Sequence, residues 1–371
     1  MHITLHLTNN CNMACKYCYV NGNKISTMRM ETAHKAVDLA AEIGGESIGI
    51  IFFGGEPLLK KDLIYETIDY CRWKQKDQNY RFHYKITTNG LLLDEEFIRY
   101  SLKENLFIAL SFDGIQKAHD AMRVDKSGEG TYTRLIDKLR MIINERPYAP
   151  VMLVVSPGTV KYYYESVVFL YEKGFKYIIC SLDYSGAWTK EHTDVLKKEY
   201  KKLSEFYYDR TIKEEKFYFS PFEVKISSHI NCDSYGTERC ELGKKQISVA
   251  PDGSLYPCVQ FVGNSFYNIG SVWTGIDEYK RQELFYRNEE EKEGCKDCAV
   301  RKRCNHHCGC LNFQTTGSID MVSPVLCAHE RIVMPVADRL AERLYKKRSE
   351  MFIQKHYNDM FPLISLIEDK T

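Results

Sequence analysis

Apolar and polar residues alternate in short runs along the first 180 residues, and longer amphipathic stretches separate these runs. Residues 3–8 repeat with the period of two of a strand, whereas the apolar residues of 30–43 recur with the period of a helix. The same criteria predict further strands at 49–53, 82–88, 106–111, 151–155 and 177–180. They predict further helices at 63–74, 95–102 with Asp94 as its N-cap, 132–144 and 163–173.

This alternation of strands and helices predicts a parallel sheet covered by helices. Right-handed crossovers would curve the sheet, so we expect an α/β fold with a partial (β/α)6 TIM-like barrel. Polar or glycine-containing motifs follow four of the predicted strands, at 11–18, 54–57, 87–89 and 111–113. Because functional residues of such barrels lie at the carboxyl ends of the strands, these motifs predict the position of an active site.

The chain changes character after a predicted connecting helix at 193–216. Beyond it the sequence is rich in cysteine, and residues 247–258 predict a β-hairpin with an Asp-Gly turn. A closing helix is predicted at 331–344, where Pro335 is compatible with a helix only in the first turn. The expected domains are a barrel at 1–216, a small cysteine-rich domain with a hairpin and helices at 217–330, and a helical tail at 331–371.

Charge and composition exclude several classes of protein. The net charge of +1 gives no reason to expect a nucleic-acid or membrane surface. No apolar run approaches the ~18 residues of a membrane helix, and the N-terminus lacks the pattern of a signal peptide. We therefore expect a cytoplasmic protein, in which the 14 cysteines are metal or cluster ligands rather than disulfides.

The first cysteine motif is Cys11-x3-Cys15-x2-Cys18. Three thiolates at this spacing can hold three irons of a four-iron cluster and leave the fourth iron open, whereas such clusters normally have four cysteine ligands. The motif directly follows the first predicted strand, and Gly54-Gly55-Glu56 follows the second. Two glycines let the backbone approach a ligand, and Glu56 offers a carboxylate to an ammonium group.

These residues resemble the signature of the radical S-adenosylmethionine (SAM) enzymes. The resemblance implies catalysis by a cluster on Cys11, Cys15 and Cys18 whose open iron binds SAM. It implies that the Gly-Gly-Glu motif holds the amino group of SAM and that Ser111 lies near its ribose. The chemistry of the remaining residues adds Thr88 as a hydroxyl for the ribose or carboxylate, Tyr17 as packing for the purine, and Arg123 as a partner of the SAM carboxylate or the substrate, or else as the brace of a loop.

The second region contains Cys295-x2-Cys298-x5-Cys304-x3-Cys308, which on spacing alone favours zinc. The full order, from Cys240 through Cys258 to Cys327, resembles the seven-cysteine SPASM domain, which follows radical SAM barrels and carries two auxiliary clusters. The resemblance implies three [4Fe-4S] clusters in all. It assigns Cys240, Cys258 and Cys308 to the first auxiliary cluster, with Cys232 as its fourth ligand, and Cys295, Cys298, Cys304 and Cys327 to the second.

Three cysteines lie outside these assignments. Cys310 is expected to be a bystander, with ligation as the alternative. Cys71 lies in a predicted helix and is expected to be a small buried side chain. Cys180 ends a predicted strand, where core packing is favoured over a role as a hydrogen-atom donor.

The resemblance implies an oxidoreductase that abstracts a hydrogen atom from a ribosomally made peptide and installs a thioether or carbon–carbon crosslink. The alternative is an anaerobic sulfatase-maturating enzyme, which forms formylglycine; that branch has an Asp after the cysteine matching Cys258, and here the residue is Val259. A second alternative is a non-catalytic zinc-binding module. The expected partners are a peptide, a separate leader-binding protein, because the chain starts at its first strand, and a reductant such as flavodoxin or ferredoxin.

Overall fold

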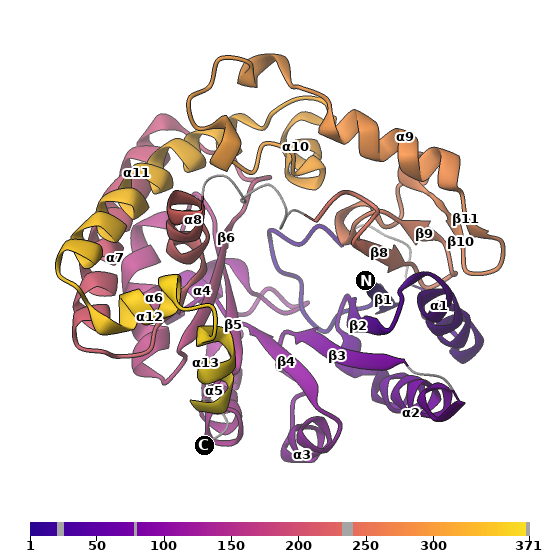
Figure 1. Cartoon of the computed structure of the whole chain (residues 1–371). Coiled ribbons are helices and arrows are strands. Elements are labelled where there is room, and N and C mark those ends of the chain that lie inside the picture. The colour runs from indigo at the N-terminus through magenta and orange to yellow at the C-terminus, as the bar shows by residue number, and fades with distance from the viewer. Residues whose placement is uncertain (21–25, 78–79, 232–239, 369–371) are drawn as a thin grey trace.

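The computed structural model describes residues 1–20, 26–77, 80–231 and 240–368. A nine-stranded sheet with the order β7-β6-β5-β4-β3-β2-β1-β8-β9 forms its centre. Its strands are β1 (His2–Thr8), β2 (Ser47–Gly54), β3 (Arg81–Thr88), β4 (Leu106–Ser111), β5 (Pro150–Val155), β6 (Tyr177–Leu182), β7 (Tyr218–Phe219), β8 (Gln246–Val249) and β9 (Leu255–Tyr256). Helices lie outside this curved sheet, as Figure 1 shows.

The six predicted strands are confirmed, and each lies parallel to its neighbour. The α/β fold class is therefore confirmed, and a partial barrel is consistent with the curved, open sheet. The sheet is larger than predicted because β7 joins one edge and β8 and β9 join the other. Strands of two residues, such as β7 and β9, are too short to give a periodic signal.

The helices are α1 (Met30–Ile43), α2 (Lys61–Asp77), α3 (Glu95–Lys103), α4 (Gln116–Met122), α5 (Tyr132–Glu145), α6 (Tyr163–Glu172), α7 (Lys190–Ile212), α8 (Ser220–Ile230), α9 (Glu278–Glu289), α10 (Gly309–Thr316), α11 (Pro324–Lys346), α12 (Glu350–Tyr357) and α13 (Phe361–Glu368). Asp94 caps α3 by accepting a hydrogen bond from the Phe97 amide at 2.8 Å, as predicted. The connecting helix α7 begins three residues earlier than the predicted 193 and ends at Ile212.

Alternate residues of the central strands face the helices. Ile3, Leu5 and Leu7 of β1 are fully buried. Complete burial of such a side chain stabilises the fold by roughly 1.5–3 kcal/mol. Because these three side chains face one side of the sheet, Thr4 and His6 between them face the other side. The orientation of the strand in turn sets the direction in which the loop at its carboxyl end leaves the sheet.

One prediction about the C-terminal helix is wrong. The helix α11 begins at Pro324 rather than at 331, so Pro335 lies in its interior and not in its first turn. An interior proline removes one helical hydrogen bond. The helix persists because the residues around Pro335, including Val333, Met334, Val336 and Ala337, are buried, and α11 packs against α7 and α8.

The predicted hairpin is confirmed, since β8 and β9 are antiparallel neighbours. β8 also pairs in parallel with β1, and Ile247 lies opposite Ile3. The expected boundary at 216 falls between α7 and β7, and the sheet continues across it through β6 and β7. In Figure 1 the segment with α9 and α10 runs along one side of the molecule, and α13 lies on the opposite side. The division into three domains stays a prediction.

The described helices include none that is both long and apolar enough to cross a membrane.

Candidate functional site

The cysteine loop that follows β1 is held by a segment distant in sequence. The amide of Ala14 donates to the Val124 carbonyl at 2.8 Å, and the amide of Lys16 donates to the Met122 carbonyl at 2.9 Å. Within the loop, the Cys18 amide donates to the Cys15 carbonyl at 3.1 Å. These bonds fix the backbone that carries Cys11, Cys15 and Cys18. Burial raises the pKa of the Cys11 and Cys15 thiols, and the charge of nearby Cys18 raises both further.

The two glycines after β2 lie directly against the backbone that leads into this loop. A Cβ atom on Gly54 would lie 2.4 Å from the Thr8 carbonyl oxygen, and one on Gly55 would lie 2.2 Å from the Asn10 carbonyl oxygen. The Gly55 amide donates to Thr8 at 2.7 Å. The glycines are therefore required for the approach of two protein segments, in addition to the predicted approach of a ligand.

Glu56 joins the ends of β2 and β3. Its Oε1 accepts hydrogen bonds from the Leu58 amide at 3.0 Å and the Thr88 hydroxyl at 2.7 Å, and its Oε2 accepts one from the Asn89 amide at 2.8 Å. Burial raises the pKa of Glu56, and these three hydrogen bonds oppose that rise. A carboxylate has about four acceptor positions, so one remains on Oε2 for a further donor.

Asn89 connects the end of β3 to the first cysteine. Its side-chain amide donates to Asn12 Oδ1 at 2.8 Å and lies 3.6 Å from Cys11 Sγ. The Met13 amide approaches the same sulfur at 3.4 Å. Burial raises the pKa of the Cys11 thiol, and these two donors oppose that rise by stabilising the thiolate, the form that ligates iron.

The predicted residues Tyr17 and Arg123 meet at Asp113, just beyond β4. Tyr17 donates its hydroxyl to Asp113 Oδ2 at 2.7 Å, and the Arg123 guanidinium lies 3.1 Å from Asp113 Oδ1 and 5.5 Å from the centre of the Tyr17 ring. Burial lowers the pKa of Arg123, but the charges of Asp113, Tyr17 and Cys15, together with the hydrogen bond to Asp113, outweigh burial and raise the pKa. Arg123 therefore braces the loop, and its predicted contact with SAM or substrate stays a prediction.

The structure places the other predicted cofactor contacts at the same edge of the sheet. Thr88 is buried at the end of β3, where its hydroxyl donates to Glu56 and accepts from the Gly90 amide at 3.0 Å. Ser111 ends β4 and is half-buried. The cysteine loop, the Gly-Gly-Glu motif, Thr88 and Ser111 thus occupy adjacent strand ends. Their contacts with SAM stay predictions.

A second group of thiols forms around the start of α10. Cys308 Sγ lies 3.4 Å from Cys310 Sγ, and the Cys310 thiol also contacts the Cys258 thiol. Cys240 is close enough to Cys308 and Cys258 for their charges to raise its pKa, after the larger effect of burial. Cys310 therefore lies beside two of the predicted ligands, and whether it is a bystander or a ligand stays a prediction. Cys232 lies outside the described residues.

The third group contains Cys295, Cys298, Cys304 and Cys327. Burial raises the pKa of Cys295, and the charges of Cys298 and Cys327 raise it further. Burial also raises the pKa of Cys304, and the charge of Cys295 contributes to that rise. Beside Cys304 lies the buried ion pair of Lys225 and Glu330. The described thiols of the two predicted auxiliary sets thus lie in two groups, although in the described part of the chain no three His, Cys, Asp or Glu converge on a single-ion site. Their ligation of clusters stays a prediction.

Two further cysteines belong to the core or pack against it, Cys71 as a buried residue and Cys180 as a partly buried one. Cys71 of α2 is fully buried, as predicted. Cys180 of β6 interacts with the Tyr163 hydroxyl at the start of α6, and burial raises the pKa of its thiol. Cys71 thus packs in the core as predicted, whereas Cys180 is partly buried against the core and its role stays a prediction.

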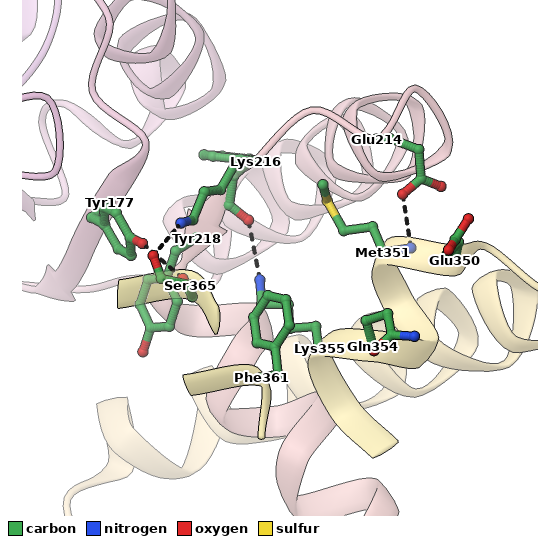
Figure 2. A pocket seen from close by; sticks show the side chains of 11 residues that line it. Tyr177, Glu214, Lys216, Tyr218, Glu350, Met351, Gln354, Lys355, Phe361 and Ser365 are labelled. Carbon is green, nitrogen blue, oxygen red and sulfur yellow. Dashed lines mark hydrogen bonds between the residues drawn. The ribbon is translucent and has the colours of Figure 1, made fainter. Parts of the chain in front are cut away.

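Two cavities lie at the opposite, amino-terminal ends of the strands. The first, of about 400 Å³, is bordered by Tyr177, Tyr218 and the helices α12 and α13. Figure 2 shows that Lys216 reaches Ser365 of α13 across it, with Nζ 3.1 Å from the carbonyl oxygen. The second, of about 610 Å³, includes Lys85 and Phe107. No residue of the cysteine loop lines either cavity.

Several residues of the site had no sequence-based role. The Asn12 side chain and the backbone carbonyls of Met122 and Val124 support the cysteine loop through partners that are far away in the sequence. Asn89 and Asp113 belong to motifs that the sequence analysis singled out by position alone. The position of Asn89 and Asp113 directly after predicted strands was the signal in the sequence that could have identified them. The residues that they bond could not be identified in this way, because those contacts form only when the strands pack side by side.

Comparison with known proteins agrees with the resemblance to radical SAM enzymes that the motifs indicated. Residues 5–167 match the sequence model of the Radical SAM superfamily. A cysteine-type anaerobic sulfatase-maturating enzyme of Clostridium perfringens is 24% identical over 326 residues, which cover 80% of this chain and 85% of that enzyme.

Two solved structures share the fold. The structure of anSMEcpe with bound AdoMet and Cp18Cys peptide has a TM-score of 0.79 and 19% identity, covering 93% of this chain and 98% of that one. Streptococcus suis SuiB bound to precursor peptide SuiA has a TM-score of 0.60 and 16% identity, covering 88% and 75%.

Proposed function

We propose that this chain, which contains a radical SAM domain at residues 5–167, matures a ribosomally made peptide by radical chemistry. The supporting observation is the position of the cysteine loop at the carboxyl edge of the sheet. The loop is hydrogen-bonded to the 122–124 segment on one side, and the residues leading into it contact the Gly-Gly-Glu turn on the other. Its product would carry an oxidative modification such as a thioether or carbon–carbon crosslink.

The donor set of the loop fits a four-iron cluster. Cys11, Cys15 and Cys18 supply three thiols, and Asn89 and the Met13 amide place donors at Cys11 Sγ. When bound, the cluster and SAM supply a 5′-deoxyadenosyl radical that removes a hydrogen atom from an unactivated carbon. The protein holds these groups in position and excludes water.

The residues around the loop would hold SAM. Glu56 has one acceptor position left, which suits the amino group of SAM, while its other hydrogen bonds fix the carboxylate. Ser111 and Thr88 would lie near the ribose, with Tyr17 near the purine. Arg123, already paired with Asp113, would contribute positive charge beside the SAM carboxylate.

The second and third thiol groups support a SPASM domain with two auxiliary [4Fe-4S] clusters. Cys240, Cys258 and Cys308, with Cys232, would hold the first cluster, and Cys295, Cys298, Cys304 and Cys327 would hold the second. Such clusters suit an oxidative reaction because they can accept the electron that a substrate radical must lose. The chain would then be an oxidoreductase with three clusters.

The peptide substrate is supported by two neighbours of the same fold, whose structures contain the Cp18Cys peptide and the precursor peptide SuiA. The alternative, a sulfatase-maturating enzyme, is supported by the relative from Clostridium perfringens. Val259 argues against that alternative, because an apolar side chain next to Cys258 cannot act as a base.

The remaining partners follow from the chemistry. The first cluster needs an electron donor such as flavodoxin or ferredoxin, and a separate protein would bind the leader of the peptide. Cluster thiols that must stay reduced require a reducing compartment, which we take to be the cytoplasm.

The experiment that tests this function combines metal analysis with product analysis. After anaerobic reconstitution, the protein should contain about twelve irons, whereas a zinc-binding module would contain zinc and no iron chromophore. Incubation with SAM, a reductant and candidate peptides should yield a peptide that has lost two hydrogens and contains a new crosslink. Formation of formylglycine in a sulfatase peptide, without any crosslink, would favour the alternative.

A further inference from the structure

The larger of the two cavities at the amino-terminal ends of the strands has the size of a ligand site. It measures about 610 Å³, and pockets for small molecules typically measure roughly 300–1,000 Å³. Tyr177, Tyr218 and Ser365 line both this cavity and the smaller one, and Figure 2 shows these three residues together. The two cavities are therefore neighbours, at the end of the sheet opposite the cysteine loop.

Three adjacent strands supply an apolar wall of the larger cavity. Phe107 of β4, Met152 of β5 and Ile179 of β6 line it. Met152 and Ile179 are partners in the register of β5 and β6, so their side chains lie on the same face of the sheet. Phe107 is 37% exposed although it belongs to a central strand. This wall can accommodate the apolar body of a ligand.

Two cations line the same cavity. Lys85 of β3 is the partner of Phe107 in the register of β3 and β4, so it lies on the face of the sheet that forms the apolar wall. Arg146 directly follows α5 and is only 3% exposed. Among the described residues, no carboxylate lines the cavity. The lining therefore carries positive charge without a matching negative charge.

The guanidinium of Arg146 has only neutral partners. Its Nε donates to the Ser101 hydroxyl at 3.2 Å and its Nη1 to the Tyr148 hydroxyl at 3.4 Å, whereas Nη2 has no hydrogen-bond partner among the described residues. Burial lowers the pKa of Arg146, which Tyr148 opposes, and burial also lowers the pKa of Lys85. Arginine nevertheless stays charged in proteins. Because a buried charge without a partner is costly, a bound anion would stabilise this arrangement.

We propose that the larger cavity is a binding site for a small organic anion with an apolar body. Lys85 and Arg146 would hold its carboxylate or phosphate group, both of which pair well with guanidinium and ammonium groups. Phe107, Met152 and Ile179 would contact its body. The site is additional to the proposed radical chemistry, since no residue of the cysteine loop lines this cavity.

The test measures binding to the reconstituted full chain by isothermal titration calorimetry. The probes are naphthoate, naphthyl phosphate, the neutral naphthamide and inorganic phosphate. Both naphthyl anions should bind with one-to-one stoichiometry, and the tighter of the two identifies the head group that the site prefers. Naphthamide lacks the charge and inorganic phosphate lacks the apolar body, so each should bind about 10-fold more weakly or less.

Variants locate the binding in this cavity. Lys85→Met and Arg146→Gln should each weaken naphthoate binding about 10-fold or more, because each removes one charged donor, whereas Lys85→Arg should retain it. Lys201→Met, which replaces an exposed lysine of α7, is the matched control and should bind as the parent does. Arg146 also supports the fold through Ser101, so Lys85→Met carries the test if Arg146→Gln does not fold.

The proposal is overturned if neither naphthyl anion binds the parent, or if Lys85→Met binds naphthoate as tightly as the parent does. The side chains of Glu368 and Asp369 lie outside the described part of the chain, so Glu368→Gln/Asp369→Asn is measured as well. Binding by that variant alone would assign the two cations to carboxylates of the chain itself and would also overturn the proposal.

The anion site and the proposed function are tested separately. Cys18→Ala should bind naphthoate as the parent does, because the cysteine loop does not line the cavity. Failure of the parent to cleave SAM would count against the proposed function and not against the anion site. Failure of the parent to bind either naphthyl anion would count against the anion site alone.

Discussion

At the residue scale, the site depends on close backbone contacts that a motif alone does not reveal. The Gly-Gly-Glu motif was interpreted as the binding site of a ligand, but its glycines first of all make room for the backbone at Thr8 and Asn10. The geometry of the cysteine loop therefore depends on Gly55 before any cofactor is bound.

We predict that Gly55→Ala lowers the iron content at Cys11, Cys15 and Cys18. The added Cβ would lie 2.2 Å from a backbone oxygen, so the loop must shift. Gly158→Ala is the control, because its Cβ would meet nothing within 4 Å. Iron analysis of both variants, in chains whose auxiliary cysteines are replaced, checks this. Equal iron in the two variants would contradict it.

A buried histidine gives a prediction about pH. His6 lies in β1 beside Phe53, and burial lowers its pKa to about 4. The unfolded chain takes up a proton at its ordinary pKa of about 6.5, whereas the folded chain does not. The contribution of His6 to stability is therefore complete above pH ~6.5 and falls by about 1.4 kcal/mol per pH unit towards pH 4.

We predict that His6→Leu removes this loss and is increasingly more stable than the parent protein as the pH falls. At pH 5.5, one unit below the unfolded pKa, the difference should have grown by about 1.4 kcal/mol relative to neutral pH. Urea unfolding of the two proteins, prepared alike at both pH values, measures it. A constant difference would show that His6 is not the titrating group.

The residues that could be predicted from the sequence were those with a chemical signature. The spacing of Cys11, Cys15 and Cys18, and the position of Glu56 after a strand, were sufficient to locate the site. The roles of Asn89 and Asp113 at the cysteine loop could not be predicted, because the loop residue that each one bonds is at least 77 positions away. Such partners are determined by the folded sheet.

At the element scale, long periodic segments were predicted well and short ones poorly. The helix at 30–43 was predicted with its observed ends, because its buried residues all lie on one face. The short α4 and the two-residue strands lack enough residues for a period. The predicted start of α11 was wrong because Pro335 was expected only in the first turn of a helix. In the structure, tertiary packing compensates for the hydrogen bond that an interior proline removes.

Lys225 connects three elements beside the third thiol group. Its Nζ lies 2.7 Å from Glu330 Oε2 of α11 and 3.2 Å from the Arg303 carbonyl, and both members of the ion pair are buried. Arg303 in turn bonds Asp338 at 2.9 Å. The cysteine-rich loop is thereby attached to α8 and α11.

We predict that Lys225→Met costs about 3–5 kcal/mol, because Glu330 would be left buried without its charge partner. The double variant Lys225→Met/Glu330→Met should recover most of this loss, since apolar replacement of both partners is often neutral. Urea midpoints measure both, with the exposed Lys201→Met as control. A double variant as unstable as the single one would contradict the account.

At the scale of the whole molecule, the sequence could indicate two regions but not how they fit together. The hairpin predicted at 247–258 extends the sheet of the first region through β8 and β1, so the parts share one sheet. Burial raises the pKa of the Tyr19 hydroxyl, and charges on Cys258 and Cys18 raise it further. Tyr19 therefore lies within electrostatic range of a thiol from each of the first two groups, a relation that spacing along the chain cannot reveal.

The central claim is that the cysteine loop generates a radical from SAM and that the other thiol groups act after this step. The most direct measurement is the formation of 5′-deoxyadenosine by the reduced, reconstituted protein. The parent protein should form it, Cys18→Ala should form none, and Cys298→Ala should keep part of the cleavage but make no modified peptide. Equal cleavage by Cys18→Ala and the parent, or none by the parent, would contradict the account.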